Sequence, residues 1–335
     1  MSLEVGFTYD LREDHLRLGA SEEDVAELDT PDSIDAIDEA LTALGCRVAR
    51  IGHVRNLVAA LAAGRRWDLV FNFAEGIRGF GREAQVPALL EAYDVPYTFS
   101  DALTSALTLH KAMCKHVLRG LGLPTPDFAL VAAPEEASQV SLPFPLFVKP
   151  VAEGSSKGVH HHSRVTTDAD LREACADLIA RFRQPVLVET FLPGREVTVG
   201  IVGTGLRAEA LGGLETAFAQ PDLSYASSAK AAFESWLDYR LADEPLASEA
   251  ARLALAAWRG LGCRDGGRVD LRCDAEGRLH VLEINPLPGL RPSFSDLCVL
   301  CDLKGVPYLE LIGRILSSAL ERVAAPRDPM RGDGC

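Results

Sequence analysis

The chain has 335 residues, 47% of them hydrophobic and 24% charged, a composition typical of a globular protein with two or three substructures. Its net charge of −14, without a compensating basic stripe, argues against nucleic-acid binding, and no apolar run reaches transmembrane length. The first residues lack the features of a signal peptide, and eight cysteines in so long a chain do not indicate a disulfide scaffold. We therefore expect a cytoplasmic protein that binds neither nucleic acid nor membrane.

Apolar segments alternate with helical patterns in the first 100 residues. The expected strands are Leu3–Phe7, Val48–Ile51 and Asp68–Phe73, and the expected helices run from Thr30-Pro31 to Gly45 and over Leu57–Ala63. This βαβ order predicts a small parallel sheet flanked by helices. The acidic segment Thr8–Asp29 shows no clear period, so we expect a loop there.

The carboxyl end of the strand Asp68–Phe73 provides a first candidate site. Glu75 and the glycine-rich loop Gly76–Gly81 follow it directly, and Glu83 opens the next helix. Open α/β sheets bind ligands at the carboxyl ends of their strands. Glu75 and Glu83 are therefore candidate substrate-binding residues.

A helical pattern over Leu103–Leu123 carries Lys111. The strand that follows, Phe144–Pro150, contains Lys149 and leads into Glu153–Gly158, a loop of small residues, hydroxyls and a further lysine. Such a loop can close over phosphates by presenting backbone N–H groups to them. It lacks the P-loop pattern, and a flexible β-turn is the alternative.

Two further strands, Val186–Glu189 and Val197–Val202, flank a Pro-Gly bend. Glu189 and Glu196 stand at the two ends of this bend. They suit the edge of a nucleotide pocket, with Glu189 toward the adenine amino group and Glu196 toward the ribose hydroxyls. On these residues alone, two ordinary surface glutamates are the alternative.

The segment Gly212–Trp236 is irregular and polar, and its Tyr225 and Lys230 make it a candidate lid. An amphipathic helix is expected over Pro245–Gly262 and a last helix over Tyr308–Val323, followed by a frayed tail.

The stretch Gly267–Gly289 reads as two strands joined by a turn at Asp274–Gly277. If Cys273 lies opposite Arg278, Asp270 faces Val281, and period-2 alternation gives one polar surface of Arg268, Asp270, Glu283 and Asn285 and one core surface of Val269, Leu271, Leu282 and Ile284. Carboxylate and carboxamide oxygens gathered beside an arginine suit a hard cation such as Mg²⁺. A plain cross-strand ion pair between Arg268 and Glu283 is the alternative.

Two tempting metal motifs are expected to be structural. Cys298 and Cys301 form a lone C-x-x-C, and on a helix they share a face as small hydrophobic residues. The run His160–His162 cannot point all three rings the same way on a strand, so we expect a loop or strand edge.

The polar signals fall in a set order along the chain: Lys111; Lys149-Pro150 with Gly154-Ser-Ser; Glu189 and Glu196 around Pro193-Gly194; Arg268-Val-Asp270; and Glu283-Ile-Asn285 with Pro288-Gly289. This ordered set, from about Asp68 to Leu316, resembles the ATP-grasp superfamily and specifically the D-alanine–D-alanine ligase family. The resemblance implies an α/β (α+β) fold of three domains that binds ATP between the second and the third. Their expected ranges are 1–100 for the small parallel-sheet domain, 101–190 for the central domain and 191–324 for the catalytic domain, with a tail at 325–335.

The resemblance also implies the roles of single residues. By their matching positions, Lys111 and Lys149 bind phosphates, Glu189, Phe191 and Leu192 hold the base, and Glu196 holds the ribose. The same matching assigns Mg²⁺ ligands (Asp270, Glu283, Asn285), the arginine beside the anionic intermediate (Arg268), the closing loop (Ser155, Ser156), the lid lysine (Lys230) and, if one extra residue is allowed, the serine for the acceptor carboxylate (Ser295). Two Mg²⁺ ions are implied, with Mn²⁺ as a substitute, and a homodimer is suggested.

The implied activity is ATP-dependent joining of a carboxylate to an amine through an acyl phosphate. The family's amino-terminal pattern of paired glycines, serine and glutamate is absent, however, and Thr8–Asp14 stands in its place. Its His-Gly element is replaced by Glu75-Gly76, and Ala231 follows Lys230 where a tyrosine is expected. We therefore expect an amino-acid ligase with altered specificity. The alternatives are a true D-alanine–D-alanine ligase of cell-wall synthesis and, in a different class, a catalytically inert ATP-binding regulatory protein.

Overall fold

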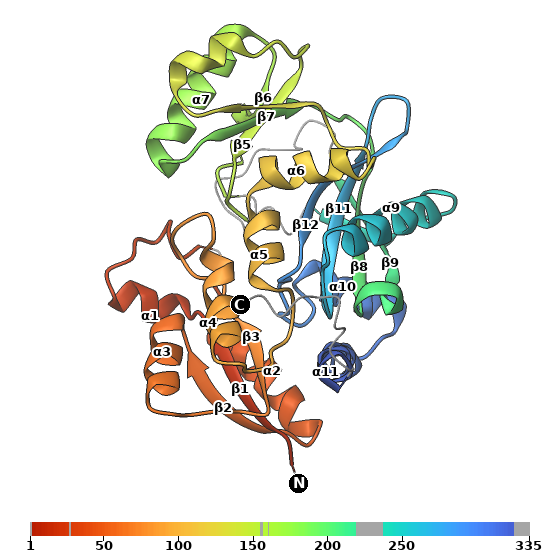
Figure 1. Ribbon diagram of the computed structural model, residues 1–335. Helices are drawn as coiled ribbons and strands as arrows, with labels where there is room; N and C mark the ends of the chain where they lie inside the picture. Colours follow the sequence, from red (N-terminus) through yellow and green to blue (C-terminus); the bar gives the residue numbers. More distant parts are fainter. Residues whose placement is uncertain (1, 27, 155–156, 160, 219–236, 325–335) are drawn as a thin grey trace.

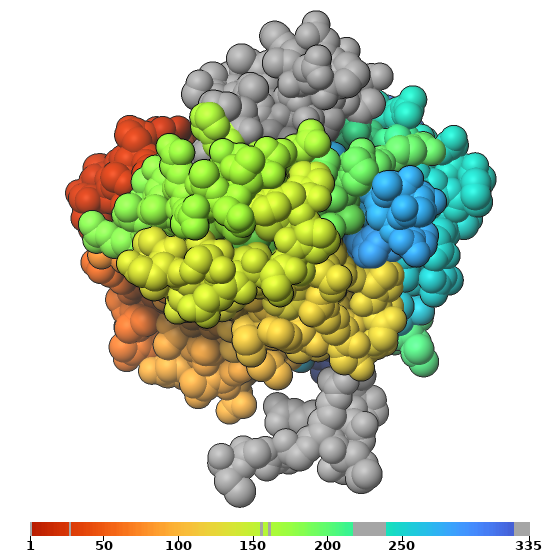
Figure 2. All heavy atoms as spheres, turned by 90° about the horizontal axis from the view of Figure 1, so that it is seen from above, coloured from red at the N-terminus to blue at the C-terminus, as the bar shows by residue number. Residues whose placement is uncertain are grey.

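Three β-sheets follow one another along the chain in the computed structural model, which describes residues 2–26, 28–154, 157–159, 161–218 and 237–324. The first sheet is parallel with strand order β2-β1-β3, whereas the second (β4-β7-β5-β6) and the third (β10-β9-β8-β11-β12) are antiparallel. Figure 1 shows the first sheet at one end of the molecule and the second at the other, with α5 and α6 between them. From above, the residues of the second sheet lie between the N-terminal and C-terminal parts of the chain (Figure 2). The α/β class expected from the sequence is confirmed.

The parallel sheet consists of β1 (Glu4–Tyr9), β2 (Arg47–Gly52) and β3 (Leu69–Phe73). Because neighbouring residues of a strand point to opposite faces, Phe7 and Phe71 pack on one side of the sheet and Val70 on the other. The helices on the first side are α2 (Pro31–Ala43) and α11 (Tyr308–Ala324), and those on the second are α3 (Val54–Ala62) and α4 (Gln85–Ala92). The last helix thus completes the core of the first sheet.

The expectation of a loop over Thr8–Asp29 is wrong in part, because α1 occupies Arg12–Arg17. This helix is too short to show an apolar period, and its one buried residue is a histidine, His15. The His15 Nε2 atom lies 2.6 Å from Asp10 Oδ1, and Asp10 Oδ2 accepts a hydrogen bond from the backbone N–H of Gly76 (2.8 Å).

The single helix expected over Leu103–Leu123 is two helices, α5 (Ala102–Leu109) and α6 (Lys111–Gly120). The break falls at His110, which leaves the helical region (φ −85°, ψ 88°) and accepts a hydrogen bond from the backbone N–H of Met113 through its ring. His110 therefore acts as the N-cap of α6, a role for which histidine gives little signal in a sequence.

The second sheet pairs β5 (Leu146–Pro150) with β7 (Val186–Thr190), and α7 (Asp168–Phe182) covers it. Two short strands were not expected, β4 (Phe128–Val131) on β7 and β6 (Arg164–Val165) on β5. Both lie at the edges of the sheet, where short strands carry little hydrophobic pattern.

The third sheet contains β8 (Glu196–Val202), β9 (Glu209–Phe218), β10 (Leu237–Leu241), β11 (Gly266–Cys273) and β12 (Leu279–Asn285), with α9 (Leu246–Gly260) packed against it. Strand β9 corrects the irregular structure expected over Gly212–Trp236, although residues 219–236 lie outside the described residues. Helix α10 (Asp296–Lys304) buries Cys298 and Cys301 in the core, as expected for small hydrophobic side chains. Within the described residues, no helix is long and apolar enough to cross a membrane.

The register expected for the β11–β12 hairpin is wrong. Arg268 pairs with Asn285 and Asp270 with Glu283, while nearer the turn Leu271 pairs with Val281, so Leu282 bulges out of the ladder. As a result Val281 is buried and Leu282 is half-buried, the reverse of the expectation. The polar surface is preserved, because the bulge moves Glu283 directly opposite Asp270.

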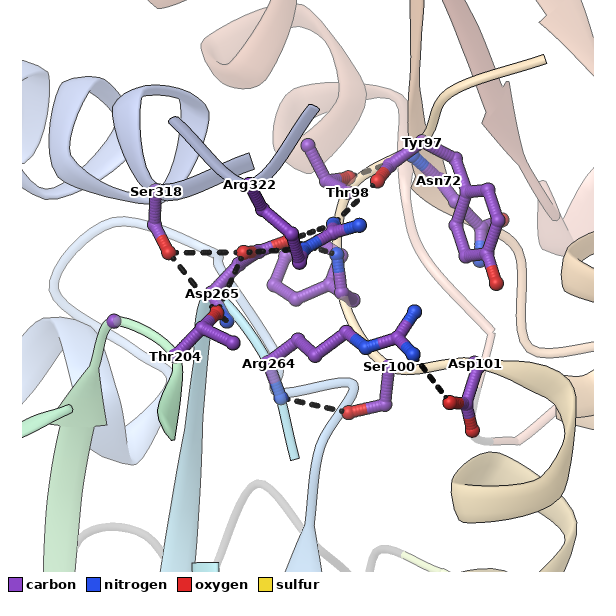
Figure 3. Close-up of polar contacts among 12 residues, drawn as sticks. Asn72, Tyr97, Thr98, Ser100, Asp101, Thr204, Arg264, Asp265, Ser318 and Arg322 are labelled. Carbon is purple, nitrogen blue, oxygen red and sulfur yellow. Dashed lines mark hydrogen bonds and ion pairs between the residues drawn. The ribbon is translucent and has the colours of Figure 1, made fainter. Parts of the chain in front are cut away.

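A buried carboxylate, that of Asp265, joins the first sheet to the third (Figure 3). It accepts hydrogen bonds from the backbone N–H of Phe99 (2.8 Å), from the hydroxyls of Thr204 (3.1 Å) and Ser318 (2.9 Å), and from the guanidinium of Arg322 (2.7 Å). These partners come from the segment after α4, the end of β8 and helix α11. A buried polar group needs such partners, because burial removes the water that would otherwise bind it.

We predict that Asp265→Ala lowers the free energy of unfolding by about 3 kcal/mol, because it leaves buried donors without an acceptor. Thermal or denaturant unfolding measures the change. The control is Asp243→Ala, which removes an exposed carboxylate that also pairs with an arginine and should leave the unfolding midpoint where it is. Equal midpoints for the two variants would contradict the prediction.

Candidate active site

The polar face of the β11–β12 hairpin brings together the side chains predicted to bind metal. The guanidinium of Arg268 donates to Asp270, and the Asn285 amide donates to Asp270 Oδ2 (3.0 Å). Glu283 lies directly across from Asp270, and its Oε2 is 3.5 Å from the Nζ of Lys111 at the start of α6. The hairpin thus contributes two carboxylates and one cation, and α6 contributes a second cation that faces them.

The two facing carboxylates differ in their affinity for a proton. Burial raises the pKa of Asp270 to about 7, against the opposing effect of Arg268. Burial also acts to raise the pKa of Glu283, but Lys111, Lys149 and Arg268 outweigh it and lower that pKa to about 2. A divalent cation between the two groups would replace the proton that Asp270 otherwise tends to hold, so the pair suits a metal ion.

Mg²⁺ usually binds one or two carboxylates and completes its shell with water and phosphate oxygens. Among the residues that the structure describes, no three histidine, cysteine, aspartate or glutamate side chains gather closely enough to hold a metal by themselves. Asp270, Glu283 and the carboxamide of Asn285 fit a shared Mg²⁺ site of this kind rather than a complete protein cage.

Glu189, at the end of β7, is a buried carboxylate between two lysines. Its Oε1 is 2.8 Å from Lys149 Nζ on β5, and its Oε2 is 2.9 Å from Lys115 Nζ on α6. Sequence reasoning singled out Glu189 and Lys149 and assigned no role to Lys115. The available signal was its position one helical turn after Lys111.

Glu196 opens β8 and lies across from Arg272 of β11, whose guanidinium donates to it at 2.9 Å. Burial raises the pKa of Glu196, and Arg272 opposes that effect. The guanidinium carbons of Arg272 and Arg164 lie 5.7 and 4.6 Å from the ring centroid of Phe191, and Leu192 beside it is buried. Arg272 was also missed, although it continues the alternation of Arg268 and Asp270 along one face of β11.

Lys111 connects the hairpin to the loop after β5. Its ammonium group donates to the backbone carbonyl of Glu153 as well as contacting Glu283. Within the loop, Lys157 Nζ lies 2.9 Å from a carboxylate oxygen of Glu153. Ser155 and Ser156, predicted to close over the site, lie outside the described residues, as do the predicted lid residues Tyr225 and Lys230.

The predicted substrate residues are more dispersed. Glu75 follows β3, and Glu83 lies in the short 3₁₀ helix Arg82–Ala84; both are half-buried. Ser295 caps α10, and its hydroxyl accepts a hydrogen bond from the backbone N–H of Arg291 (3.0 Å). Asp296, which sequence reasoning did not single out, lies 3.5 Å from the Arg268 guanidinium.

A cavity of about 310 Å³ lies where the N-terminal and central parts of the chain meet. Arg78, Phe80, Arg82, Glu153, Lys157 and Gln184 are among its lining residues. The Arg82 guanidinium donates to the carbonyl of Ala152 (2.6 Å), which holds the two parts together there. A larger cavity of about 1060 Å³ lies beside α11, and in the described part of the chain neither cavity is lined by a predicted site residue.

Comparison with known proteins shows which family the chain resembles. Residues 117–317 match the family model described as "D-ala D-ala ligase C-terminus". A D-alanine–D-alanine ligase of Xylella fastidiosa is 36% identical over 301 residues, which is 84% of this chain and 91% of that protein. A relative from Sinorhizobium fredii named "Uncharacterized protein y4sG" is 36% identical over 262 residues, covering 77% of this chain and 76% of its own.

Solved structures show the same fold. The Bacillus anthracis D-alanine–D-alanine ligase complexed with ATP superposes with a TM-score of 0.71 at 21% identity, over 96% of this chain and 98% of that one. The VanG D-Ala:D-Ser ligase of Enterococcus faecalis gives a TM-score of 0.72 at 18% identity, over 95% and 100% of the two chains. With the matched family model and the relatives at 36% identity, these findings show that the chain belongs to the D-alanine–D-alanine ligase family of ATP-grasp proteins.

Proposed function

We propose that this ATP-dependent, ADP-forming ligase activates a carboxyl group as an acyl phosphate and transfers it to the amine of an amino acid, with a substrate pair other than two D-alanines. The observation that carries the proposal is the face of the hairpin, where Asp270 stands opposite Glu283, Arg268 binds Asp270 and Lys111 lies 3.5 Å from Glu283. Acidic oxygens and cations arranged in this way suit phosphoryl transfer from a metal-bound nucleotide.

ATP is proposed to bind between the second and third sheets. Glu189 would face the adenine amino group, and Glu196 the ribose hydroxyls. Lys111 and Lys149 would contact the phosphates, and Phe191 and Leu192 would line the base. The contacts of these residues support the assignment, because Glu189 and Glu196 each lie beside a cation.

Asp270, Glu283 and Asn285 are the proposed ligands of two Mg²⁺ ions, for which Mn²⁺ would substitute. Bound there, the ions would neutralise charge on the transferred phosphoryl group. Of the protein's own residues, Arg268 would stand beside the acyl carbon, where an oxyanion develops as the amine attacks. A fixed donor in that position contributes about 3 kcal/mol to the stabilisation of a transition state.

The reaction proposed has two steps. A substrate carboxylate oxygen first attacks the γ-phosphorus of ATP, which gives an acyl phosphate and ADP. The amine nitrogen then attacks the acyl carbon, the bond from that carbon to the phosphate oxygen breaks, and an amide and inorganic phosphate result. Ser156 and Lys230, outside the described residues, are proposed to complete the closed site.

The first substrate is proposed to differ from D-alanine because this end of the site is built differently. Asp10 follows β1, in the segment that replaces the family's glycine and glutamate pattern, and it is already bound to His15 and the N–H of Gly76. Glu75 and Glu83 remain the proposed substrate contacts, together with Tyr225 and Ser295 toward the acceptor. The charged cavity lined by Arg78 and Arg82, which lie between Glu75 and Glu83 in the chain, supports a polar substrate.

A second candidate is a true D-alanine–D-alanine ligase, favoured by relatives of that name at 36% identity over 84% of the chain. The presence of Lys111, Lys149 and the polar side chains of the hairpin disfavours an inert ATP-binding protein.

We further propose that the enzyme is cytoplasmic and acts on small-molecule substrates. Its net charge of −14 disfavours nucleic acid as a partner, and the resemblance suggests a homodimer.

A panel of D- and L-amino acids decides between the two ligase candidates. We expect ADP and phosphate release with particular amino-acid pairs, none of it without them, and at most weak activity with D-alanine alone. Efficient formation of D-alanyl-D-alanine at ordinary KM would establish the second candidate, and ADP release by no pair at all would favour the inert class.

We predict that Glu283→Ala abolishes turnover, because it removes a proposed metal ligand and leaves Lys111 facing Asp270 alone. Kinetics over a Mg²⁺ titration, with circular dichroism to check folding, measure the effect. The matched control is Glu276→Ala in the exposed turn of the same hairpin, which should keep wild-type activity. Full activity of Glu283→Ala would remove this residue from the site.

We predict that Arg268→Ala lowers kcat by about 100-fold while the affinity for ATP changes little, because the guanidinium acts on the acyl carbon and not on the nucleotide. ATP titration and steady-state kinetics separate the two quantities. Arg278→Ala, which removes the exposed arginine of the same hairpin, is the control. Wild-type kcat for Arg268→Ala would show that its proposed role is wrong.

A further inference from the structure

Lys115 of α6 is completely buried, which is unusual for a lysine. Burying an ammonium group in protein costs several kcal/mol unless charged and hydrogen-bonding partners replace its water. None of the catalytic steps described above uses this residue. Burial lowers the pKa of Lys115, and Glu189 opposes that effect. The neighbours of Lys115 therefore indicate what this buried amino group does.

Two partners replace the water around Lys115. Its Nζ lies 2.9 Å from Glu189 Oε2 and donates to the hydroxyl of Thr125 at 2.9 Å. The Thr125 hydroxyl in turn donates to the backbone carbonyl of Val281 at 2.8 Å. Lys115 thus connects α6, the end of β7 and strand β12.

Glu189 consequently has a cation on each of its oxygens, since Lys149 lies 2.8 Å from Oε1. Burial acts to raise the pKa of Glu189, but Lys115 and Lys149 outweigh it and lower that pKa. An ionised carboxylate has no hydrogen to donate and can only accept. Any nucleobase edge that meets Glu189 must therefore supply a donor.

We propose that Lys115 is a positioning residue for nucleotide choice: it holds Glu189 in place as a fixed acceptor, so that the site takes a 6-aminopurine and rejects a 6-oxopurine. The inference rests on the proposed placement of the base beside Glu189. An amino group at C6 donates to the carboxylate, whereas an oxo group presents a lone pair to it, so that two acceptors face each other. Sites of this kind discriminate strongly, because the wrong ligand leaves a buried polar group without its partner.

The test compares ATP with ITP, which differ at C6 by an amino and an oxo group, in binding titrations and in steady-state kinetics. The wild-type protein should prefer ATP by about 10-fold or more. In Lys115→Met the KM for ATP should rise by about 10-fold with a smaller loss of kcat. The KM for ITP should change little, so the ratio of kcat/KM for ATP to that for ITP should fall toward one. Lys115→Arg, which keeps the cation, should keep most of the preference.

Arg119→Met removes an exposed cation from the same helix and should behave as wild type. Lys115→Gln serves as a second neutral variant if Lys115→Met does not fold, and it should also lose preference relative to Lys115→Arg. Folded neutral variants that keep the wild-type ATP-to-ITP ratio would overturn the inference. A wild-type protein that binds neither nucleotide would instead overturn the proposed function.

Discussion

The buried carboxylate of Asp265 is the joint on which the arrangement of the molecule depends. It accepts from donors of the N-terminal segment, β8 and α11, and it lies three residues before Arg268 on the chain that enters β11. The same joint therefore fixes the start of the strand that carries Arg268 and Asp270. Because α11 also completes the core of the first sheet, the N-terminal part is held to the third sheet both by apolar packing and by this network. The sheet that carries Arg268 and Asp270 is therefore joined to the N-terminal part by two kinds of contact.

The candidate active site is built from carboxylates in close ion pairs with lysines and arginines. Glu189 lies between two lysines, Glu196 lies against Arg272, and Glu283 faces Lys111. The two lysines beside Glu189 outweigh burial and lower its pKa. Burial instead raises the pKa of Glu196 despite Arg272, and that of Asp270 to about 7 despite Arg268. Asp270 and Glu283, whose pKa values shift in opposite directions, are the two carboxylates proposed to share Mg²⁺.

Much of the fold and of the candidate site could be predicted from the sequence, because long elements show a clear hydrophobic period and the polar motifs occur in a recognisable order. The βαβ order, α7 and the polar surface of the hairpin all followed from pattern. The predictions that were wrong concern features that depend on local geometry or on contacts between distant residues. The bulge at Leu282 shifts the register without changing the alternation around it, the break at His110 depends on a histidine cap, and α1 is too short for a period. Lys115 was passed over because burial of a lysine cannot be read from its neighbours in sequence.

The break at His110 gives α6 a fixed beginning, with Lys111 in its first turn and Lys115 one turn further on. The helix rises about 1.5 Å per residue, so the Cα atoms of the two lysines are about 6 Å apart along the helix axis. One of them faces the acidic hairpin and the other the carboxylate at the end of β7. Helix α6 thus carries the cations of both contacts on one element, and a change that tilted it would move Lys111 away from the hairpin and Lys115 away from Glu189 together.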